Sequence, residues 1–331
     1  MLPFVNTMLG PAKQLANVWR TVRDVDLDAI RSAADSTFTL LIVGETLDDA
    51  THLRELLTPP GQPDHPWIVP VEAAPGIGGT GDGLPIAILL SRQPAPTAPM
   101  AAVRETVLAR GGRVIDVVLG QPRSSTPAPI KGGPGPLVAP AIDSRLAHDL
   151  GLRVAGVSGE NGRLAIARQI PAWREPIITA IIEETAQANA SYAFATGIAE
   201  MVPLISAPLA VGDIVIMTKN QLMMAYRVAL AAGLEGDARR LMPEIIGVLG
   251  GGLLLRQVAR ELVGLIPILG LAPKVAVSYG GTYAIGRAVA AWAQGGQAAS
   301  RAVFRRWSRE GLERGRRVAH AFTERRDTPS R

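Results

Sequence analysis

Between residues 36 and 170, short continuous apolar runs alternate with segments of helical periodicity. A continuous apolar run between turn signals is typical of a strand that is buried on both faces, as parallel strands are. This alternation predicts a doubly wound α/β sheet. The predicted strands are Phe38–Gly44, Trp67–Val71, Pro85–Leu90, Val114–Leu119 and Arg153–Val157, and the predicted helices are Asp48–Leu57, Met100–Arg110 and Ile142–Leu150. Two stretches rich in proline and glycine, Thr58–Pro66 and Gln121–Pro140, are predicted surface loops.

The pattern changes after Pro176, where a long predicted helix, Ile177–Ala199, precedes three apolar segments. These segments are Met201–Met217, Ile245–Leu255 and Leu262–Gly286, and only the third is long enough to span a bilayer. Recurrent glycines mark places where helix backbones approach closely, either in a membrane or in a tightly packed soluble bundle. Five prolines are expected to divide the segments into half-helices or hairpins: Pro203, Pro208, Pro243, Pro267 and Pro273.

These changes predict an α/β domain joined to an all-α domain. A helical arm is expected at 1–35, the α/β domain at 36–170, a hydrophobic helical domain at 171–300 and a basic amphipathic tail at 301–331. The first ten residues lack the basic start and the cleavage site of a signal peptide. The bulk of the protein is therefore expected in the cytoplasm or on the cytoplasmic face of a membrane.

Composition limits the chemistry that side chains offer. The chain has no cysteine, which excludes disulfides, thiolate nucleophiles and zinc–cysteine sites. Its four histidines are too scattered along the chain for a metal site, and no Ser–His–Asp or paired-carboxylate arrangement stands out. We therefore expect no catalytic residues, no metal and no cofactor.

The turn after the first predicted strand lies where a phosphate-binding P-loop would lie. A P-loop needs G-x-x-x-x-G-K-[ST], because its glycines let backbone N–H groups approach phosphate and its lysine neutralises it. Gly44 and Thr51 fit this spacing, but Asp49 replaces the second glycine and Ala50 replaces the lysine. The added acids would repel phosphates, so nucleotide binding is not expected here.

Two further nucleotide motifs are degenerate, and a third is only weakly echoed. After Val114–Leu119, where a GTPase carries N-K-x-D, the chain has Gly120, Gln121, Pro122 and Arg123, so a positive charge replaces the guanine-reading aspartate. Val157–Gly162 takes the expected place of the last guanine loop, and Glu72–Gly76 weakly resembles the D-x-x-G switch without its aspartate. The nucleotide-binding motifs have lost their key residues while the predicted order of the strands is retained, and this combination favours a degenerate P-loop GTPase-like domain. The alternative is a flavodoxin-like or Rossmann-like sheet with accidental echoes.

Four segments of the second half of the chain are distinctive: Ala190–Met217, Gly247–Leu262, Leu265–Gly270 and Thr282–Ala288. In these segments the chain resembles the YcjF-type domain-of-unknown-function family. In that family the helical domain often follows an Era-like GTPase domain, and Trp19–Arg31 and Ala167–Arg174 look like such fused members. The resemblance therefore implies a GTPase-like first domain, from which this sequence departs at its nucleotide motifs.

Late aromatic and basic residues predict contact with a membrane. The candidate contacts are Tyr279, Tyr283, Trp292, Phe304, Trp307, Arg305 and Arg306. Asp213, an acid inside an apolar run, is a candidate buried charge with Arg256, Arg260 or Lys219 as its partner. No nucleic-acid motif accompanies the basic tail.

The sequence thus predicts a non-catalytic, membrane-associated scaffold or adaptor with a pseudo-GTPase domain. Membrane lipids are the expected partners, and a protein partner or homo-oligomer is an alternative. A nucleotide-responsive switch and a soluble helical-bundle interaction protein are the rival functions.

Overall fold

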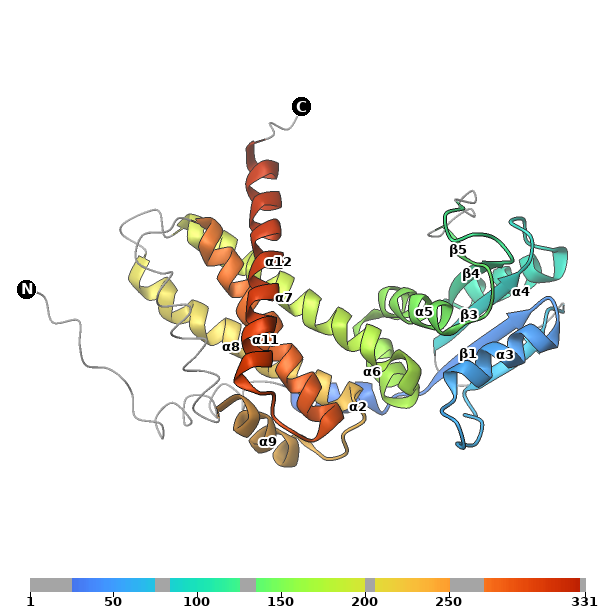
Figure 1. Ribbon diagram of the computed structural model, residues 1–331, viewed down its shortest axis with the longest axis horizontal. Helices are drawn as coiled ribbons and strands as arrows, with labels where there is room; N and C mark the ends of the chain where they lie inside the picture. The colour runs from blue at the N-terminus through green and yellow to red at the C-terminus, as the bar shows by residue number, and fades with distance from the viewer. Residues whose placement is uncertain (1–25, 75–83, 126–134, 200–205, 251–270, 328–331) are drawn as a thin grey trace, which may run out of the picture. The chain divides into compact units, whose positions relative to one another are not determined.

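The computed structural model describes residues 26–74, 84–125, 135–199, 206–250 and 271–327, which fall into two compact units (Figure 1). The α/β unit comprises residues 30–180 with 230–235. The helical unit comprises 181–229 and 236–331, together with the residues up to 29. The division falls inside one long helix, α7 (Arg174–Ala199), beyond the predicted boundary at residue 170.

The α/β unit is built on a five-stranded, fully parallel sheet with the order β2-β1-β3-β4-β5. Four strands confirm predicted ones: β1 (Phe38–Gly44), β2 (Ile68–Glu72), β3 (Leu84–Ser91) and β4 (Arg113–Leu119). Every residue of β1 is buried, as its continuous apolar run requires of a central strand. A mixed α/β architecture with many helices is therefore present.

The fifth strand was wrongly predicted. Residues 153–157 belong to helix α5 (Ser144–Val157), which starts at the side-chain cap of Asp143. Leu146, Leu150 and Val154 recur every four residues on its buried face, and this spacing is helical. The sheet instead ends in the three-residue β5 (Leu137–Ala139), inside the stretch predicted as a loop.

Helices cover both faces of the sheet. Helix α4 (Ala98–Ala109) packs Met100, Val103 and Val107 against the odd-numbered residues of β1 and β3. Helix α3 (Leu47–Leu57) contacts β1, β2 and α5 on the other face, where α6 (Gly159–Gln169) also meets β1 (Figure 1). The short α2 (Leu27–Ala34) precedes β1, and the 3-10 turn η1 (Pro171–Trp173) leads into α7.

The helical unit contains α8 (Ser206–Ala231), α9 (Ala238–Gly250), α11 (Leu271–Gly295) and α12 (Arg301–Asp327), with most of α7. Pro208 and Pro273 lie in the first turns of α8 and α11, where the missing N–H costs no helical hydrogen bond. They therefore begin helices and do not break them. Pro243 lies inside α9, whereas Pro203 and Pro267 fall outside the described residues.

Helices α11 and α12 touch through their backbones. A Cβ atom built on Gly315 would lie 2.5 Å from the carbonyl oxygen of Ala276, and one on Gly311 would lie 2.9 Å from that of Gly280. These four residues, Ala276, Gly280, Gly311 and Gly315, form two small-x-x-x-small pairs and are called here the glycine seam. Of the recurrent glycines at which the sequence predicts close approach of helix backbones, Gly280 confirms the prediction, whereas Gly281 and Gly247 have open space beside them. The predicted basic tail is thus a helix of the helical unit.

Candidate functional site

The carboxyl edge of the sheet is the first candidate site, because strand order reverses between β1 and β3. In doubly wound sheets, ligands bind in the crevice outside the strands at this point. Gly44 ends β1 here, and a Cβ at this position would lie 2.2 Å from the carbonyl oxygen of Thr46, so glycine is required. Thr46 then caps α3 by accepting a hydrogen bond from the backbone N–H of Asp49.

An ion pair between an arginine whose side chain is 61% exposed and a largely buried aspartate lies at this edge. Arg92, which follows β3, donates to both carboxylate oxygens of Asp49 at 2.8 and 3.1 Å. Asp49 is 8% exposed and lies in the first turn of α3, where the helix dipole favours an anion. Ala50 is fully buried and Thr51 is half-buried, so the position of the P-loop lysine presents no side chain to solvent at the crevice.

The loop after β4 is closed by a second set of ion pairs. Gly120 has φ +79°, a conformation that favours glycine, and Gln121 is half-buried. Arg123 donates to Asp143 at 2.9 Å and to Asp149 at 3.0 Å, so it ties this loop to α5. The hydrogen bond from the Leu146 backbone N–H to Asp143, helped by Arg123, holds the pKa of that carboxyl below its usual range. Arg123 therefore has a structural role that its sequence position did not reveal.

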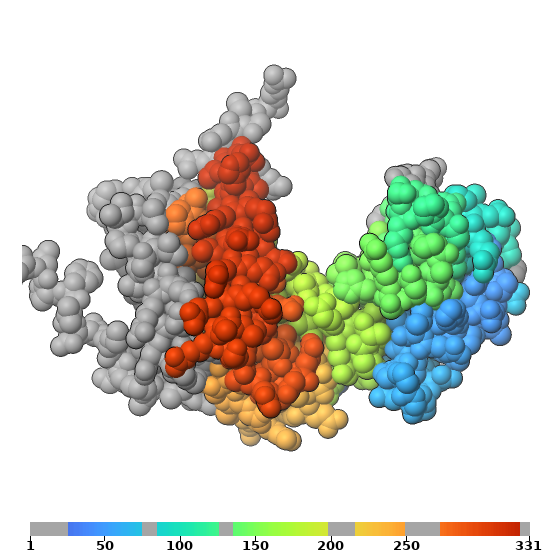
Figure 2. Space-filling model, in the orientation of Figure 1, coloured from blue at the N-terminus to red at the C-terminus, as the bar shows by residue number. Residues whose placement is uncertain are grey.

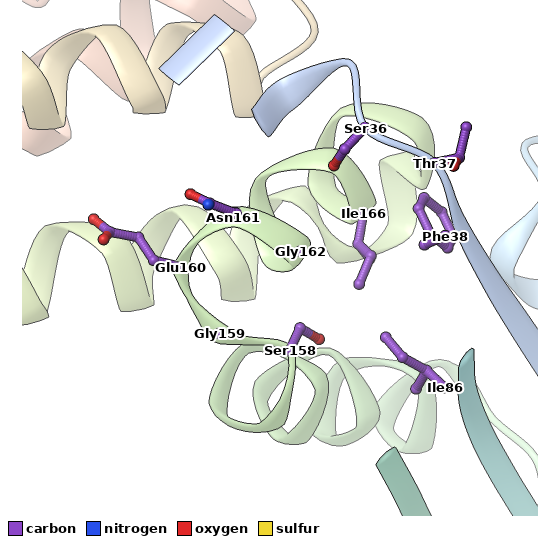
Figure 3. Close-up of a pocket in the computed structure, with 10 residues that line it drawn as sticks. All are labelled: Ser36, Thr37, Phe38, Ile86, Ser158, Gly159, Glu160, Asn161, Gly162 and Ile166. Atoms are coloured by element: carbon purple, nitrogen blue, oxygen red, sulfur yellow. The ribbon is translucent and has the colours of Figure 1, made fainter. Parts of the chain in front are cut away.

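The predicted last guanine loop lies at the wrong edge of the sheet. Residues 158–162 line a pocket of about 450 Å³ with Ser36, Thr37, Phe38, Ile86 and Ile166, at the amino ends of β1 and β3 (Figure 3). The Ser158 hydroxyl donates to the carbonyl of Val154 and that of Ser36 donates to Ala33. These two donors are thus satisfied by the protein itself.

A buried polar cluster joins three helices of the helical unit. Asn189 of α7 and Thr282 of α11 are both fully buried and share a 3.0 Å hydrogen bond. Asn220 and Gln221 of α8 donate to Asn189 and Thr282 respectively. Because buried amides and hydroxyls are costly unless paired, the cluster fixes how these helices align. Asp213 lies in α8, but its side chain is outside the described part of the chain.

The structure buries four of the five predicted membrane-contact aromatics. Tyr279, Tyr283, Phe304 and Trp307 are each at most 8% exposed, whereas Trp292 is half-buried. In the folded helical unit these four rings pack inside the unit and are not presented at its surface, and their contact with lipid stays a prediction. Arg305 and Arg306 are exposed as expected. None of the described helices is both long and apolar enough for a transmembrane span, and residues 262–270 of the predicted span are outside the described residues.

A charged cluster holds α12 against α7 and α11. Arg314 forms ion pairs with Glu183 and Glu310, and its guanidinium lies 4.9 Å from the ring centre of Tyr283. Burial and a hydrogen bond to Glu310 raise the pKa of Tyr283 to about 12, so this phenol stays protonated. The cluster adjoins a second pocket, of about 420 Å³, lined by Glu183, Gln187, Tyr279, Arg314, Arg317, Val318, Ala321 and Phe322.

Among the described residues, no group of three or more His, Cys, Asp or Glu side chains is arranged to hold a metal ion. Neither family models, curated proteins nor solved structures give a match to this chain.

Proposed function

We propose that this chain is a non-catalytic adaptor with a degenerate GTPase-like domain, held on the cytoplasmic face of a membrane through its helical domain. The observation that carries the proposal is the ion pair between Asp49 and Arg92 at the switch point of the sheet. It places the protein's own carboxylate at the helix N-terminus that a phosphate would need.

Electrostatics supports the absence of nucleotide binding. Glu45, Asp48, Asp49 and Glu72 lie at or beside the ends of β1 and β2, and the cation Arg92 is already neutralised by Asp49. Two like charges about 4 Å apart repel by roughly 4 kcal/mol near a protein surface. The same argument applies to the flavodoxin-like alternative, whose strand order this sheet shares, because its cofactors also bring phosphate to the β1–β3 crevice.

The adaptor role follows from what each domain retains. The sheet keeps its order and its buried core, while Arg92 and Arg123 are both committed to internal ion pairs. A domain that folds without its ligand chemistry still offers surfaces for partners. The resemblance of the helical domain to the YcjF-type family adds no activity of its own.

Nucleotide titration tests the first part of the proposal. The full chain is titrated with GTP and with GDP in the presence of Mg²⁺ in a calorimeter, and we expect no heat of binding at about 1 mM nucleotide, a concentration at which even millimolar affinity would register. A variant with Asp49→Gly and Ala50→Lys tests whether these two residues are the cause. Micromolar binding by the unaltered chain would overturn the pseudo-GTPase proposal.

Cell fractionation tests the second part. We expect the full chain in the membrane fraction and its release by alkaline carbonate, because the described helices include no span. Retention after carbonate would instead indicate integral insertion. Recovery wholly in the soluble fraction would contradict membrane association and favour the soluble helical-bundle alternative.

A further inference from the structure

Helix α12 has two chemically distinct faces. The inner face, Phe304, Trp307, Gly311, Gly315 and Ala319, is buried along α11 and its neighbours. The outer face is dominated by exposed arginines. Between 301 and 324 these are Arg301, Arg305, Arg306, Arg309, Arg316 and Arg317, against two exposed acids, Glu313 and Glu324.

Four of these arginines form a row along the helix. At about 100° per residue, Arg301, Arg305, Arg309 and Arg316 fall within an arc of roughly 80°, and they span roughly 22 Å along the axis. None of the four forms a hydrogen bond or an ion pair with any described residue, unlike Arg314 on the adjoining face. Figure 2 shows α12 on the near face of the helical unit, uncovered by other described elements. The row is therefore free to meet an external anion.

The shape and the neighbours of the row favour an anionic lipid surface as its occupant. A straight row parallel to the helix axis lets all four charges meet one plane at the same depth. Proteins that bind single-stranded nucleic acid add aromatic platforms on which bases stack, but Phe304 and Trp307 are buried on the opposite face. The exposed positions of residues 301–316 hold only arginine, one alanine and one glutamate, so the face offers positive charge but no amide that could read adenine.

We propose that the arginine row Arg301–Arg305–Arg309–Arg316 binds acidic phospholipid headgroups and holds α12 flat on the membrane, without insertion of its aromatic residues. This inference rests on the membrane association proposed above and names the surface and the lipid class. Each basic residue near an acidic leaflet contributes about a fivefold gain in affinity. Attachment is then electrostatic, and salt screens it.

Vesicle co-sedimentation of the full chain tests the proposal. We expect sedimentation with vesicles of phosphatidylcholine that contain about 30% phosphatidylserine, an acidic lipid that attracts basic segments. We expect no sedimentation with vesicles of phosphatidylcholine alone. Replacement of all four arginines by glutamine should weaken binding roughly a hundredfold or more. Replacement of the four by lysine should retain binding, because the charge is kept.

A matched control removes the same charge elsewhere. Arg145, Arg153, Arg239 and Arg240 lie in α5 and α9, outside the row, and their replacement by glutamine should leave vesicle binding within about threefold, because salt screens charges that do not themselves meet the lipid plane. Far-UV circular dichroism checks that each variant keeps its helical content.

Three outcomes would overturn the proposal. Equal binding of the four-glutamine variant would place the lipid contact elsewhere, and equal binding to neutral vesicles would mean apolar insertion. Sedimentation with neither vesicle type would exclude an acidic lipid surface as the binding partner of the arginine row, whether or not the chain binds duplex DNA. Nucleotide titration is independent of all three, so failure of the pseudo-GTPase proposal and failure of the arginine row are distinguishable.

Discussion

The glycine seam between α11 and α12 gives a sharp prediction for a single added methyl group. In Gly315→Ala, the new Cβ would lie 2.5 Å from the carbonyl oxygen of Ala276 and 2.8 Å from its Cα, both backbone atoms that no rotamer change moves. Helix α12 would have to retreat by about 1 Å to restore van der Waals distances. We therefore expect α12 to lose stability although alanine is the better helix former.

The expected magnitude combines two opposing terms. Overpacking of a close contact costs about 1–3 kcal/mol. Replacing glycine by alanine inside a helix contributes about 1 kcal/mol in the opposite direction, which leaves about 0–2 kcal/mol. A gap of about 0.5–1 Å also loses roughly a quarter to a half of each dispersion contact along the seam, so the net destabilisation for Gly315→Ala is expected in the upper half of that range, about 1–2 kcal/mol. Gly311→Ala, whose Cβ would be 2.9 Å from the Gly280 carbonyl oxygen, should cost less.

Gly281 offers a matched control in the partner helix. It lies next to Gly280 in α11, yet a Cβ there meets nothing within 4 Å. Gly281→Ala should therefore stabilise the helical unit by up to about 1 kcal/mol. The same chemical change at neighbouring positions of one helix pair is thus expected to have opposite signs.

Hydrogen exchange by mass spectrometry measures these effects where they occur. Peptides covering residues 301–324 report the opening of α12, and 1.4 kcal/mol corresponds to a tenfold change in exchange rate. We expect faster exchange in Gly315→Ala and slower or equal exchange in Gly281→Ala. If Gly315→Ala slows exchange as much as Gly281→Ala does, the backbone contact does not exist and the reasoning fails.

Three other predictions concern buried and capping groups. Arg104→Met leaves the buried carboxylate of Asp116 without its ion-pair partner and should destabilise the α/β unit by about 3–5 kcal/mol in urea unfolding, whereas the double variant with Asp116→Leu should recover most of that loss. Asn189→Leu removes the acceptor of Asn220 and a donor to Thr282 and should cost about 1–3 kcal/mol, while Ser191→Ala on the exposed side of α7 should change stability by less than about 0.5 kcal/mol. Asp143 has a folded pKa below its unfolded value of about 3.9, so its contribution is present above that pH and is lost as the pH falls through the folded pKa. Amide protection at the start of α5 should fall in that acidic window, and it should become independent of pH there in Asp143→Asn; an unchanged acid response in that variant would assign the effect to another group.

Strands were predictable where burial dictated composition. The run Phe38–Gly44 is apolar because β1 lies between two other strands and under helices on both faces, so sequence and structure agree to the residue. Strand β5 was missed because only three residues of it pair, within a stretch whose prolines and glycines signal a loop. The apolar residues of 153–157 resemble a strand when viewed alone, but they continue the four-residue spacing of α5.

The candidate site was predictable only in part, because its contacts join residues far apart in the chain. Asp49 was identified as a departure from the P-loop pattern, but nothing in its neighbourhood pointed to Arg92, which follows a different strand. The sequence shows that Arg123 replaces the guanine-reading aspartate of a GTPase. Its pairing with Asp143 and Asp149 depends on where α5 begins. Gly311 and Gly315 were hidden among arginines and glutamates, so their close packing required the partner helix to be seen.

The glycine seam also constrains which genetic changes the protein tolerates. Every single-base change that replaces a glycine codon with that of another amino acid adds a side chain, and at Gly280, Gly311 and Gly315 that side chain would meet backbone atoms. Alanine is the smallest residue reached in this way, and arginine, aspartate, glutamate and valine, also one base away, are all larger. The mildest first step is therefore the alanine whose cost at Gly315 is worked out above as about 1–2 kcal/mol. Purifying selection should be strongest there, whereas Gly281, with open space beside it, is free to vary.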